Sequence, residues 1–359
     1  MKPLYGERLG RLRALLSAKK LDAVLVTDLK NIRYLTGFTG SNAYAVVSSD
    51  RAFFLTDPRY EAQSAKEVKG FRVKIFKKAL DALAKTVVSA KAGVLGFESS
   101  SMSFDNYSKL AKALRSKARL KPAPGLFSTL RRVKDRSEVE KIREAASLLD
   151  RGFARAMKVV KPGARERDAA FSIESFWRKR GAEGLAFDTI IATGARGALP
   201  HGKASEKLIK KGELIVVDMG VLLNGYNSDE TRTFVTGAPT RKQKEVYNIV
   251  KDAQAAAIDS IRPGVSASAV DRAARGVIEK AGYGKFFGHG TGHGVGLDIH
   301  EAPGLGPTSN EVLEEGMVIT VEPGIYLPGW GGVRIEDMAL VTKGGSQILT
   351  GTTRELVIL

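Results

Sequence analysis

The chain has 359 residues, a length that suits about two domains rather than a single hydrophobic core. Hydrophobic residues make up 43%, and the mean hydropathy of −0.13 describes a soluble globular protein. No run approaches the roughly 18 apolar residues that a membrane span needs, and the N-terminus lacks the pattern of a secretory signal. The absence of cysteine excludes disulfides, zinc-thiolate sites and cysteine nucleophiles, and it fits a cytoplasmic location.

The net charge of +18 leaves open a partner such as nucleic acid or an anionic surface. Lysine and arginine are nevertheless scattered along the chain, as in "KKLD", "KIFKKAL" and "RKRG", and are not gathered in one block with interleaved aromatic residues. We interpret the charge as a solvated surface, and we expect neither a nucleic-acid nor a membrane partner.

The first third of the chain alternates strand-like and helix-like runs. The strand-like runs are "LDAVLVTD", "YAVVSSDRAFFLTD", "FRVKIF" and "GVLGFES". This alternation predicts an α/β domain over residues 1–125. The run "KPAPG" at 121–125 then predicts a linker.

A helical pattern follows the predicted linker. Apolar residues recur at helical spacing at Val139, Ile142, Ala146, Leu149, Phe153 and Met157. Ser137 and Glu140 have the spacing of a capping box at its start. The pattern stops at "KPG", and a second helix is predicted from about Glu166 to Gly181.

The same order of elements returns about a hundred residues later. A helix with Val246 and Val250 on its apolar face stops at "RPG", and a second helix runs to Gly282. Pro162 to Gly181 and Pro263 to Gly282 are both separations of nineteen residues. In addition, "KKGELIVVDMG" aligns with "EEGMVITVEPG". Residues 130–359 are therefore predicted to contain a duplicated helix–helix–strand–hairpin unit.

Each copy carries two carboxylates on a predicted hairpin. In the first copy, Asn224-Gly225 predicts a two-residue turn that pairs Leu223 with Tyr226. Because side chains alternate with period two, this register places Asp218 and Asp229 as diagonal neighbours on one face.

In the second copy, Glu322 and Glu336 are each seven residues from Gly329. A symmetric loop therefore places these two carboxylates opposite each other. Arg334 lies two residues before Glu336 and shares its face.

Four carboxylates from two related hairpins would repel one another unless a cation lay among them. Three of the four histidines fall in "GHGTGHGVGLDIHEAP" at 288–303, and the fourth, His201, follows a predicted strand in "GALPHG". Oxygen-rich sites with an imidazole suit Mn, Co, Fe or Zn, and bridging carboxylates suit a pair of ions. The sequence therefore predicts a two-metal site.

These segments carry a resemblance to a known family. The chain resembles the pita-bread metallopeptidases of the aminopeptidase P and prolidase group. The segments that carry the resemblance are "PHG", "VDMG", "NSDETRTF", "GHGTGHGVGLDIHEAP", "TVEPGIY" and "GVRIED", with "NIRYLTGFTGSNAYAVV" and "TDPRY" nearer the N-terminus. The resemblance implies an α+β protein. Its C-terminal pseudo-twofold pita-bread domain, residues 130–359, follows a smaller α/β creatinase-like domain, residues 1–125, which serves substrate access and oligomerisation.

The resemblance also implies the site. Two divalent ions, manganese or cobalt before zinc, would be held by Asp218, Asp229, His293, Glu322 and Glu336, with Asp229 and Glu336 bridging. The catalytic set would be His201, His289, His300, Glu322 and Arg334. Glu322 would transfer the proton, His289 and His300 would stabilise the tetrahedral intermediate, and Arg334 would support the ligands. The implied protein is a homodimeric Xaa-Pro aminopeptidase acting on peptides with proline second; the alternative is a strict Xaa-Pro dipeptidase.

Other classes share parts of this pattern. A metal-free basic binding protein and a creatinase-like hydrolase both conflict with the full ligand set, and methionine aminopeptidases usually lack the N-terminal domain. Some dipeptidase members of the group carry an arginine directly after "HExP" to bind the substrate carboxylate. Here "HEAPG" places Gly304 there, so Arg59 of "TDPRY" remains a candidate cation.

Overall fold

A computed structural model describes residues 4–115 and 117–359 of the chain. These residues divide into two compact units, with the boundary between Arg131 and Arg132. Within the described part, none of the helices combines the length and hydrophobicity that a membrane crossing requires.

The N-terminal unit is built on a six-stranded mixed sheet with the strand order β4-β3-β2-β1-β5-β6. The strands are β1 (Ala23–Val26), β2 (Ala43–Ser48), β3 (Ala52–Thr56), β4 (Arg72–Ile75), β5 (Val94–Phe97) and β6 (Arg119–Pro122). The helices are α1 (Tyr5–Ala18), α2 (Leu29–Thr36), α3 (Glu61–Glu67), α4 (Ala79–Ser89), α5 (Phe104–Leu114) and α6 (Leu126–Arg131), with a 3-10 turn η1 (Pro58–Tyr60). The predicted α/β character and every predicted strand are present.

The predicted linker at 121–125 is wrong in its first half. Lys121 and Pro122 end β6, where Lys121 pairs with Gly96 and Pro122 with Phe97 of β5. Proline is tolerated there because β6 is an edge strand and needs no donor on its outer side. The chain leaves this unit only after α6.

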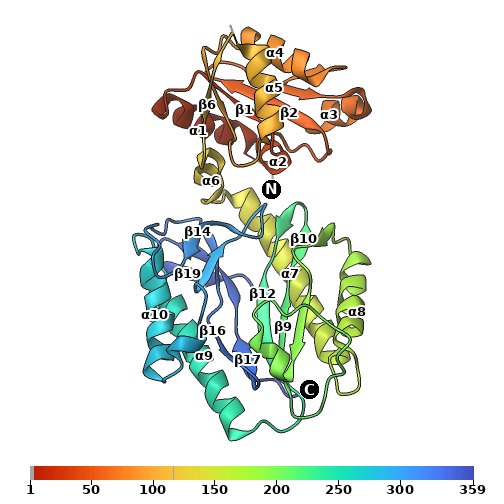
Figure 1. The fold of residues 1–359 in the computed structure, drawn as a ribbon, viewed down its shortest axis with the longest axis vertical. Helices are drawn as coiled ribbons and strands as arrows, with labels where there is room; N and C mark the ends of the chain where they lie inside the picture. The colour runs from red at the N-terminus through yellow and green to blue at the C-terminus, as the bar shows by residue number, and fades with distance from the viewer. Residues whose placement is uncertain (1–3, 116) are drawn as a thin grey trace. The chain divides into compact units, whose positions relative to one another are not determined.

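The C-terminal unit places one helix pair on each side of its sheets (Figure 1). On one side lie α7 (Arg136–Val159) and α8 (Glu166–Arg178), and on the other α9 (Arg241–Ser260) and α10 (Ala267–Lys280). Each pair packs on its own hydrophobic core: Leu149, Phe153 and Trp177 belong to the first, Val246 and Val250 to the second. The predicted duplication is thus a structural one.

Two details of the first helix differ from the prediction. Its capping box is formed by Asp135 and Glu138, because Asp135 precedes the first helical residue and accepts from the backbone N–H of Ser137 and Glu138. Met157, predicted on the apolar face, is 37% exposed because it lies near the end of the helix, beyond Phe153.

The strands of this unit form several short sheets. The first copy supplies β7 (Gly184–Leu185), β8 (Ile190–Thr193), β9 (Leu214–Met219), β10 (Val221–Leu223), β11 (Tyr226–Asn227) and β12 (Glu230–Val235). The second supplies β13 (Gly292–Gly294), β14 (Glu301–Leu305), β15 (Val318–Val321), β16 (Gly324–Leu327), β17 (Gly331–Arg334), β18 (Asp337–Thr342) and β19 (Gly345–Ile348). Two 3-10 turns, η2 (Gly194–Ala198) and η3 (Gly284–Phe286), complete it.

Both predicted hairpin registers are confirmed. Leu223 pairs with Tyr226 across a turn whose Asn224 and Gly225 both have positive φ, and the same register continues to Asp218 opposite Thr231. In the second copy, Gly324 pairs with Arg334 and Val321 with Asp337, as a loop symmetric about Gly329 requires.

The packing of the first helix pair gives a stability prediction. A Cβ on Gly152 of α7 would lie 2.3 Å from the fully buried ring of Trp177 on α8. We expect Gly152→Ala to lower the free energy of unfolding by about 1–3 kcal/mol through overpacking. Gly276→Ala is the control, because a Cβ there meets nothing within 4 Å and should stabilise α10 by roughly 0.5–1 kcal/mol. Equal effects of the two variants in denaturant titrations would contradict this close approach.

Candidate metal centre

A cavity of about 880 Å³ lies in the C-terminal unit. Every residue that the sequence predicted for the site lines this cavity: His201, Asp218, Asp229, His289, His293, His300, Glu322, Arg334 and Glu336. Its lining also includes Phe187, Ile190, Phe286, Tyr326 and Pro328, so an apolar surface accompanies the charged groups.

The four acids lie where the two hairpins are interrupted. Asp218 is near the end of β9 and Asp229 directly precedes β12, at the break between the β9–β12 and β10–β11 ladders. Glu322 directly follows β15 and Glu336 lies between β17 and β18, at the corresponding break in the second copy. The duplication therefore brings two matched pairs of carboxylates together.

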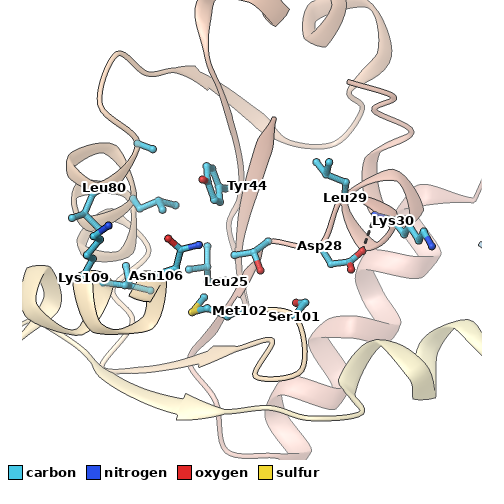
Figure 2. A pocket seen from close by; sticks show the side chains of 14 residues that line it. Leu25, Asp28, Leu29, Lys30, Tyr44, Leu80, Ser101, Met102, Asn106 and Lys109 are labelled. Atoms are coloured by element: carbon cyan, nitrogen blue, oxygen red, sulfur yellow. Dashed lines mark hydrogen bonds between the residues drawn. The ribbon is translucent and has the colours of Figure 1, made fainter. Parts of the chain in front are cut away.

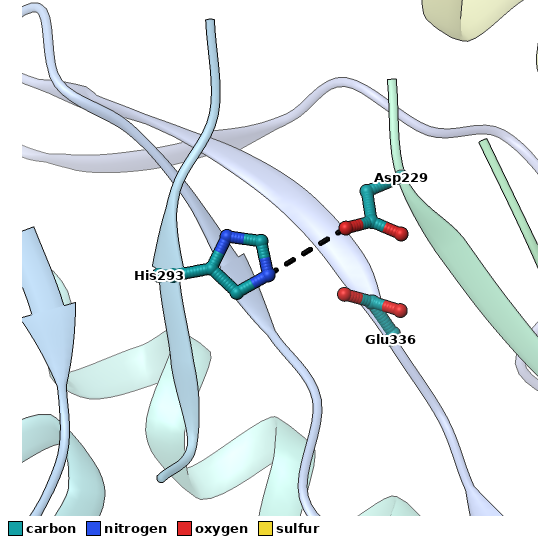
Figure 3. Close-up of side chains that lie close together, drawn as sticks. All are labelled: Asp229, His293 and Glu336. Carbon is teal, nitrogen blue, oxygen red and sulfur yellow. Dashed lines mark ion pairs between the residues drawn. The ribbon is translucent and has the colours of Figure 1, made fainter. Parts of the chain in front are cut away.

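Two of these acids, Asp229 and Glu336, surround together with His293 a point where a cation can bind (Figure 3). Ligand atoms of Asp229, His293 and Glu336 all lie within 4.8 Å of one another. The Nε2 atom of His293 is 3.6 Å from Oδ2 of Asp229 and 3.5 Å from Oε1 of Glu322. At these distances the side chains lie close together but do not form direct hydrogen bonds with one another.

Burial and mutual repulsion disfavour the ionised forms of the carboxyl groups in this site. Burial raises the pKa of Glu322 to about 7, and burial together with the neighbouring carboxylates raises the pKa values of Asp229 and Glu336 well above their usual range. Oδ1 of Asp218 is buried and has no hydrogen-bond partner among the described residues. Unsatisfied oxygens and mutually repelling carboxylates fit a site for divalent cations.

His293 has the tautomer that a metal ligand requires. Its Nδ1 lies 3.0 Å from the carbonyl oxygen of Gly294, so Nδ1 carries the proton and donates it, which leaves the Nε2 lone pair facing Asp229 and Glu322. Burial lowers the pKa of His293 to about 4, so the imidazole is neutral near pH 7.

The glycines around His293 allow a close approach of three strands. β13 lies between β14 and β15. A Cβ on Gly292 would lie 2.0 Å from the carbonyl oxygen of Thr320, and one on Gly294 would lie 2.4 Å from that of Ala302. Glycine is therefore required on both sides of His293 to hold its ring at the acids.

Arg334 connects several parts of the site. Its guanidinium donates to Oδ2 of Asp218 at 2.7 Å, to the hydroxyl of Tyr326 at 2.7 Å and to Oγ1 of Thr231 at 3.0 Å. Thr231 in turn donates to Oε2 of Glu336 at 2.7 Å. Arg334 therefore orients one ligand directly and a second through Thr231.

Tyr326 is a site residue that the sequence reasoning missed. Nδ1 of His289 lies 2.8 Å from the carbonyl oxygen of Gly290 and donates to it, so Nε2 accepts from the hydroxyl of Tyr326, 2.8 Å away. Burial lowers the pKa of His289 to about 4, which keeps the ring neutral. The sequence offered one indication of Tyr326, an aromatic residue at strand spacing in "TVEPGIY". The same pattern is equally typical of a tyrosine in the hydrophobic core.

The other two histidines, His201 and His300, are both exposed. His300 follows β13 on the chain, and its ring centroid is 4.4 Å from that of His293. His201 is exposed on the turn that follows η2. Both face the cavity from outside the carboxylate cluster, so they are placed to contact a bound molecule.

A second cavity, of about 570 Å³, lies in the N-terminal unit between Tyr44, Leu80 and Asn106 (Figure 2). Among the residues that line it there is no histidine, and its one carboxylate, Asp28, accepts from the backbone N–H of Lys30 as the cap of α2. Its lining lacks a cluster of carboxylates and histidines that could hold a metal ion, so the cavity at Asp229 and Glu336 is the candidate active site.

The carboxyl pKa values give a pH prediction for metal binding. Because Glu322 has a pKa of about 7 in the metal-free protein, its carboxyl is protonated below that pH, and a binding cation must displace this proton. His293, with a pKa of about 4, is already neutral over this range, so no proton has to leave its Nε2 atom. Affinity for Mn²⁺ should therefore fall as the pH is lowered from about 7, by up to about tenfold per unit for each displaced proton. Calorimetry in two buffers of different ionisation enthalpy measures the protons released. An affinity that stays constant to about pH 5.5 would contradict the prediction, and Glu322→Gln should release fewer protons.

A duplicated unit that closes around buried carboxylates and a neutral histidine defines a metallohydrolase of the pita-bread type. Residues 140–343 match the sequence profile of metallopeptidase family M24, and residues 8–133 match that of the Creatinase/Prolidase N-terminal domain. The chain belongs to metallopeptidase family M24 and is a metallopeptidase.

Relatives with both domains are similar over their full length. The Xaa-Pro dipeptidase of Pyrococcus horikoshii is 41% identical over 99% of both chains. The solved structure of a Xaa-Pro dipeptidase from Bacillus anthracis has a TM-score of 0.96 at 42% identity, covering 99% of this chain and 100% of that one. The X-Pro aminopeptidase from Thermotoga maritima has a TM-score of 0.90 at 36% identity, covering 97% and 100%.

Proposed function

We propose that this protein hydrolyses the bond between the first residue and a following proline in short peptides, using two divalent metal ions. The observation that carries the proposal is the convergence of Asp218, Asp229, His293, Glu322 and Glu336 in one cavity. Similarity over the full length to proteins named Xaa-Pro dipeptidase and X-Pro aminopeptidase supports the choice of substrate.

Those five residues would hold the ions, with Asp229 and Glu336 as the bridging ligands. Such ions act as Lewis acids and generate a nucleophile from water at neutral pH. Glu322 is the chain's own acid–base group, because burial sets its pKa to about 7, where a carboxyl can both accept and return a proton. It would take a proton from the attacking water and pass it to the leaving proline nitrogen.

The other polar groups of the cavity would orient the substrate. The hydroxyl of Tyr326 bridges His289 and Arg334, so these three side chains form one hydrogen-bonded wall. Because the proton of the neutral His289 ring is on Nδ1, Nε2 is an acceptor and must gain a proton before it can donate to the developing oxyanion. His300 and His201 lie on the cavity wall without that constraint. Phe187 and Ile190 offer the apolar surface that suits a proline ring.

Substrate length is the next part of the proposal. Gly304, the position after "HEAP", is exposed and does not line the cavity, and Arg59 is held by Asp57, with Nε 2.8 Å from Oδ1. Neither supplies a clamp for a proline carboxylate. We expect Ala-Pro-Ala to be cleaved at least as well as Ala-Pro.

The test compares kcat/KM for these two peptides. Ala-Ala-Ala, without proline, and N-acetyl-Ala-Pro-Ala, without a free amine, are the controls that should be poor substrates. Exclusive cleavage of Ala-Pro would show that the protein is a strict dipeptidase. Cleavage of all four peptides at equal rates would contradict the proposed specificity for proline.

The resemblance supplies three finer parts of the proposal. They are manganese or cobalt as the preferred metal, a homodimer, and a role of the N-terminal unit in substrate access. A cytoplasmic location is proposed from the composition.

A further inference from the structure

The cavity has a cation at its exposed rim. Lys285 lies in η3 and lines the cavity together with its neighbour Phe286. Lys285 is exposed, whereas Asp229 and Glu336 on the floor are only 5% and 2% exposed. Lys285 is therefore an exposed cation on the wall of the cavity that contains these buried acids.

The charge of Lys285 makes a cation–π contact but has no ion-pair partner among the described residues. Its ammonium lies 5.0 Å from the ring centroid of Phe286, and no hydrogen bond or ion pair to it is found among the described residues. The other permanent cation of the cavity, Arg334, is buried and committed to Asp218, Thr231 and Tyr326. Among the described residues that line the cavity, Lys285 is thus the permanent cation available to pair with a bound molecule.

The backbone next to Lys285 is held in place. Arg275 donates to the carbonyl oxygens of Phe287 at 3.0 Å and His289 at 2.8 Å, and it is itself paired with Asp271. A lysine on a fixed segment presents its charge at a defined place, with only its own side chain to order on binding.

The charge pattern of the cavity matches a peptide that enters amine first. The floor carries the acids and would hold the free amine, so the rest of the peptide extends towards the rim at about 3.3–3.6 Å per residue. We propose that Lys285 binds the C-terminal carboxylate of di- and tripeptide substrates and so favours short peptides. This inference rests on the proposed Xaa-Pro activity, and it assigns to a rim lysine the clamp that neither Gly304 nor Arg59 supplies.

The test is a comparison of free and amidated peptides. Ala-Pro, Ala-Pro-Ala and a pentapeptide beginning Ala-Pro are each assayed as the acid and as the C-terminal amide, with wild type, Lys285→Met and Lys285→Arg. For both the dipeptide acid and the tripeptide acid, Lys285→Met should raise KM by about three- to fivefold, as expected for the loss of an exposed ion pair, and leave kcat nearly unchanged. The amides and the pentapeptide should be unaffected, Lys285→Arg should behave as wild type, and the difference should shrink at high ionic strength.

Lys280→Met is the matched control, because Lys280 is an exposed lysine at the end of α10 that does not line the cavity. Equal KM changes for acids and amides, or for all three lengths, would overturn the role of Lys285, as would no change at all. If wild type cleaves none of the peptides, the proposed function itself fails, and this outcome is distinct from an active enzyme that ignores the charge at position 285.

Discussion

Removal of divalent metal ions will abolish the peptidase activity. Without cations, the buried carboxyls of Asp229 and Glu336 have pKa values well above their usual range, and the groups that would activate water are absent. Dialysis against a chelator should give an inactive protein that recovers on addition of Mn²⁺ or Co²⁺. The expected loss is the entire catalysed rate above background, since the chain's own groups supply only acid–base and orienting contributions.

Metal content measured by elemental analysis should track this recovery. Two ions per chain are expected at full activity. Asp229→Asn, which changes a proposed metal ligand, should bind fewer ions and should not recover at the Mn²⁺ concentration that restores wild type. Full activity in protein shown to be free of metal would refute the mechanism.

Replacement of Glu322 by glutamine should have the next largest effect. Glutamine is nearly the same size, but it cannot accept a proton, and we expect kcat to fall by roughly 10²-fold or more. The partly buried carboxyl of Glu322 also lies 3.5 Å from Nε2 of His293, so the variant should bind metal more weakly.

The measurement is kcat at saturating metal and substrate, which separates proton transfer from ligand loss. Glu315→Gln is the matched control, because Glu315 is an exposed glutamate seven residues earlier that does not line the cavity. A kcat near that of wild type, with metal bound, would remove Glu322 from the proton-transfer role.

The sequence by itself determined the two hairpins and the acids on them. Asn224-Gly225 allows a turn with two positive φ values, and the spacing about Gly329 allows a symmetric loop. Both are local properties, and the period-two alternation of a strand then fixes which side chains share a face. The duplication could be detected for the same reason, because each copy repeats the positions of its turn and helix-ending residues.

Only the tertiary structure decided how the cavity wall is assembled. The bond between Tyr326 and His289 joins residues 37 apart, and the bond between Arg334 and Asp218 joins residues 116 apart, so no local pattern encodes either. The free charge of Lys285 is likewise visible only once its surroundings are known. Strand β6 shows the same limit in the N-terminal unit: "KPAPG" has the composition of a linker, but its first two residues are strand because β5 offers them an open edge. Turn conformations and the periodicity of helices and strands are determined by neighbouring residues. Hydrogen-bond partners and burial instead depend on segments that come together only when the chain has folded.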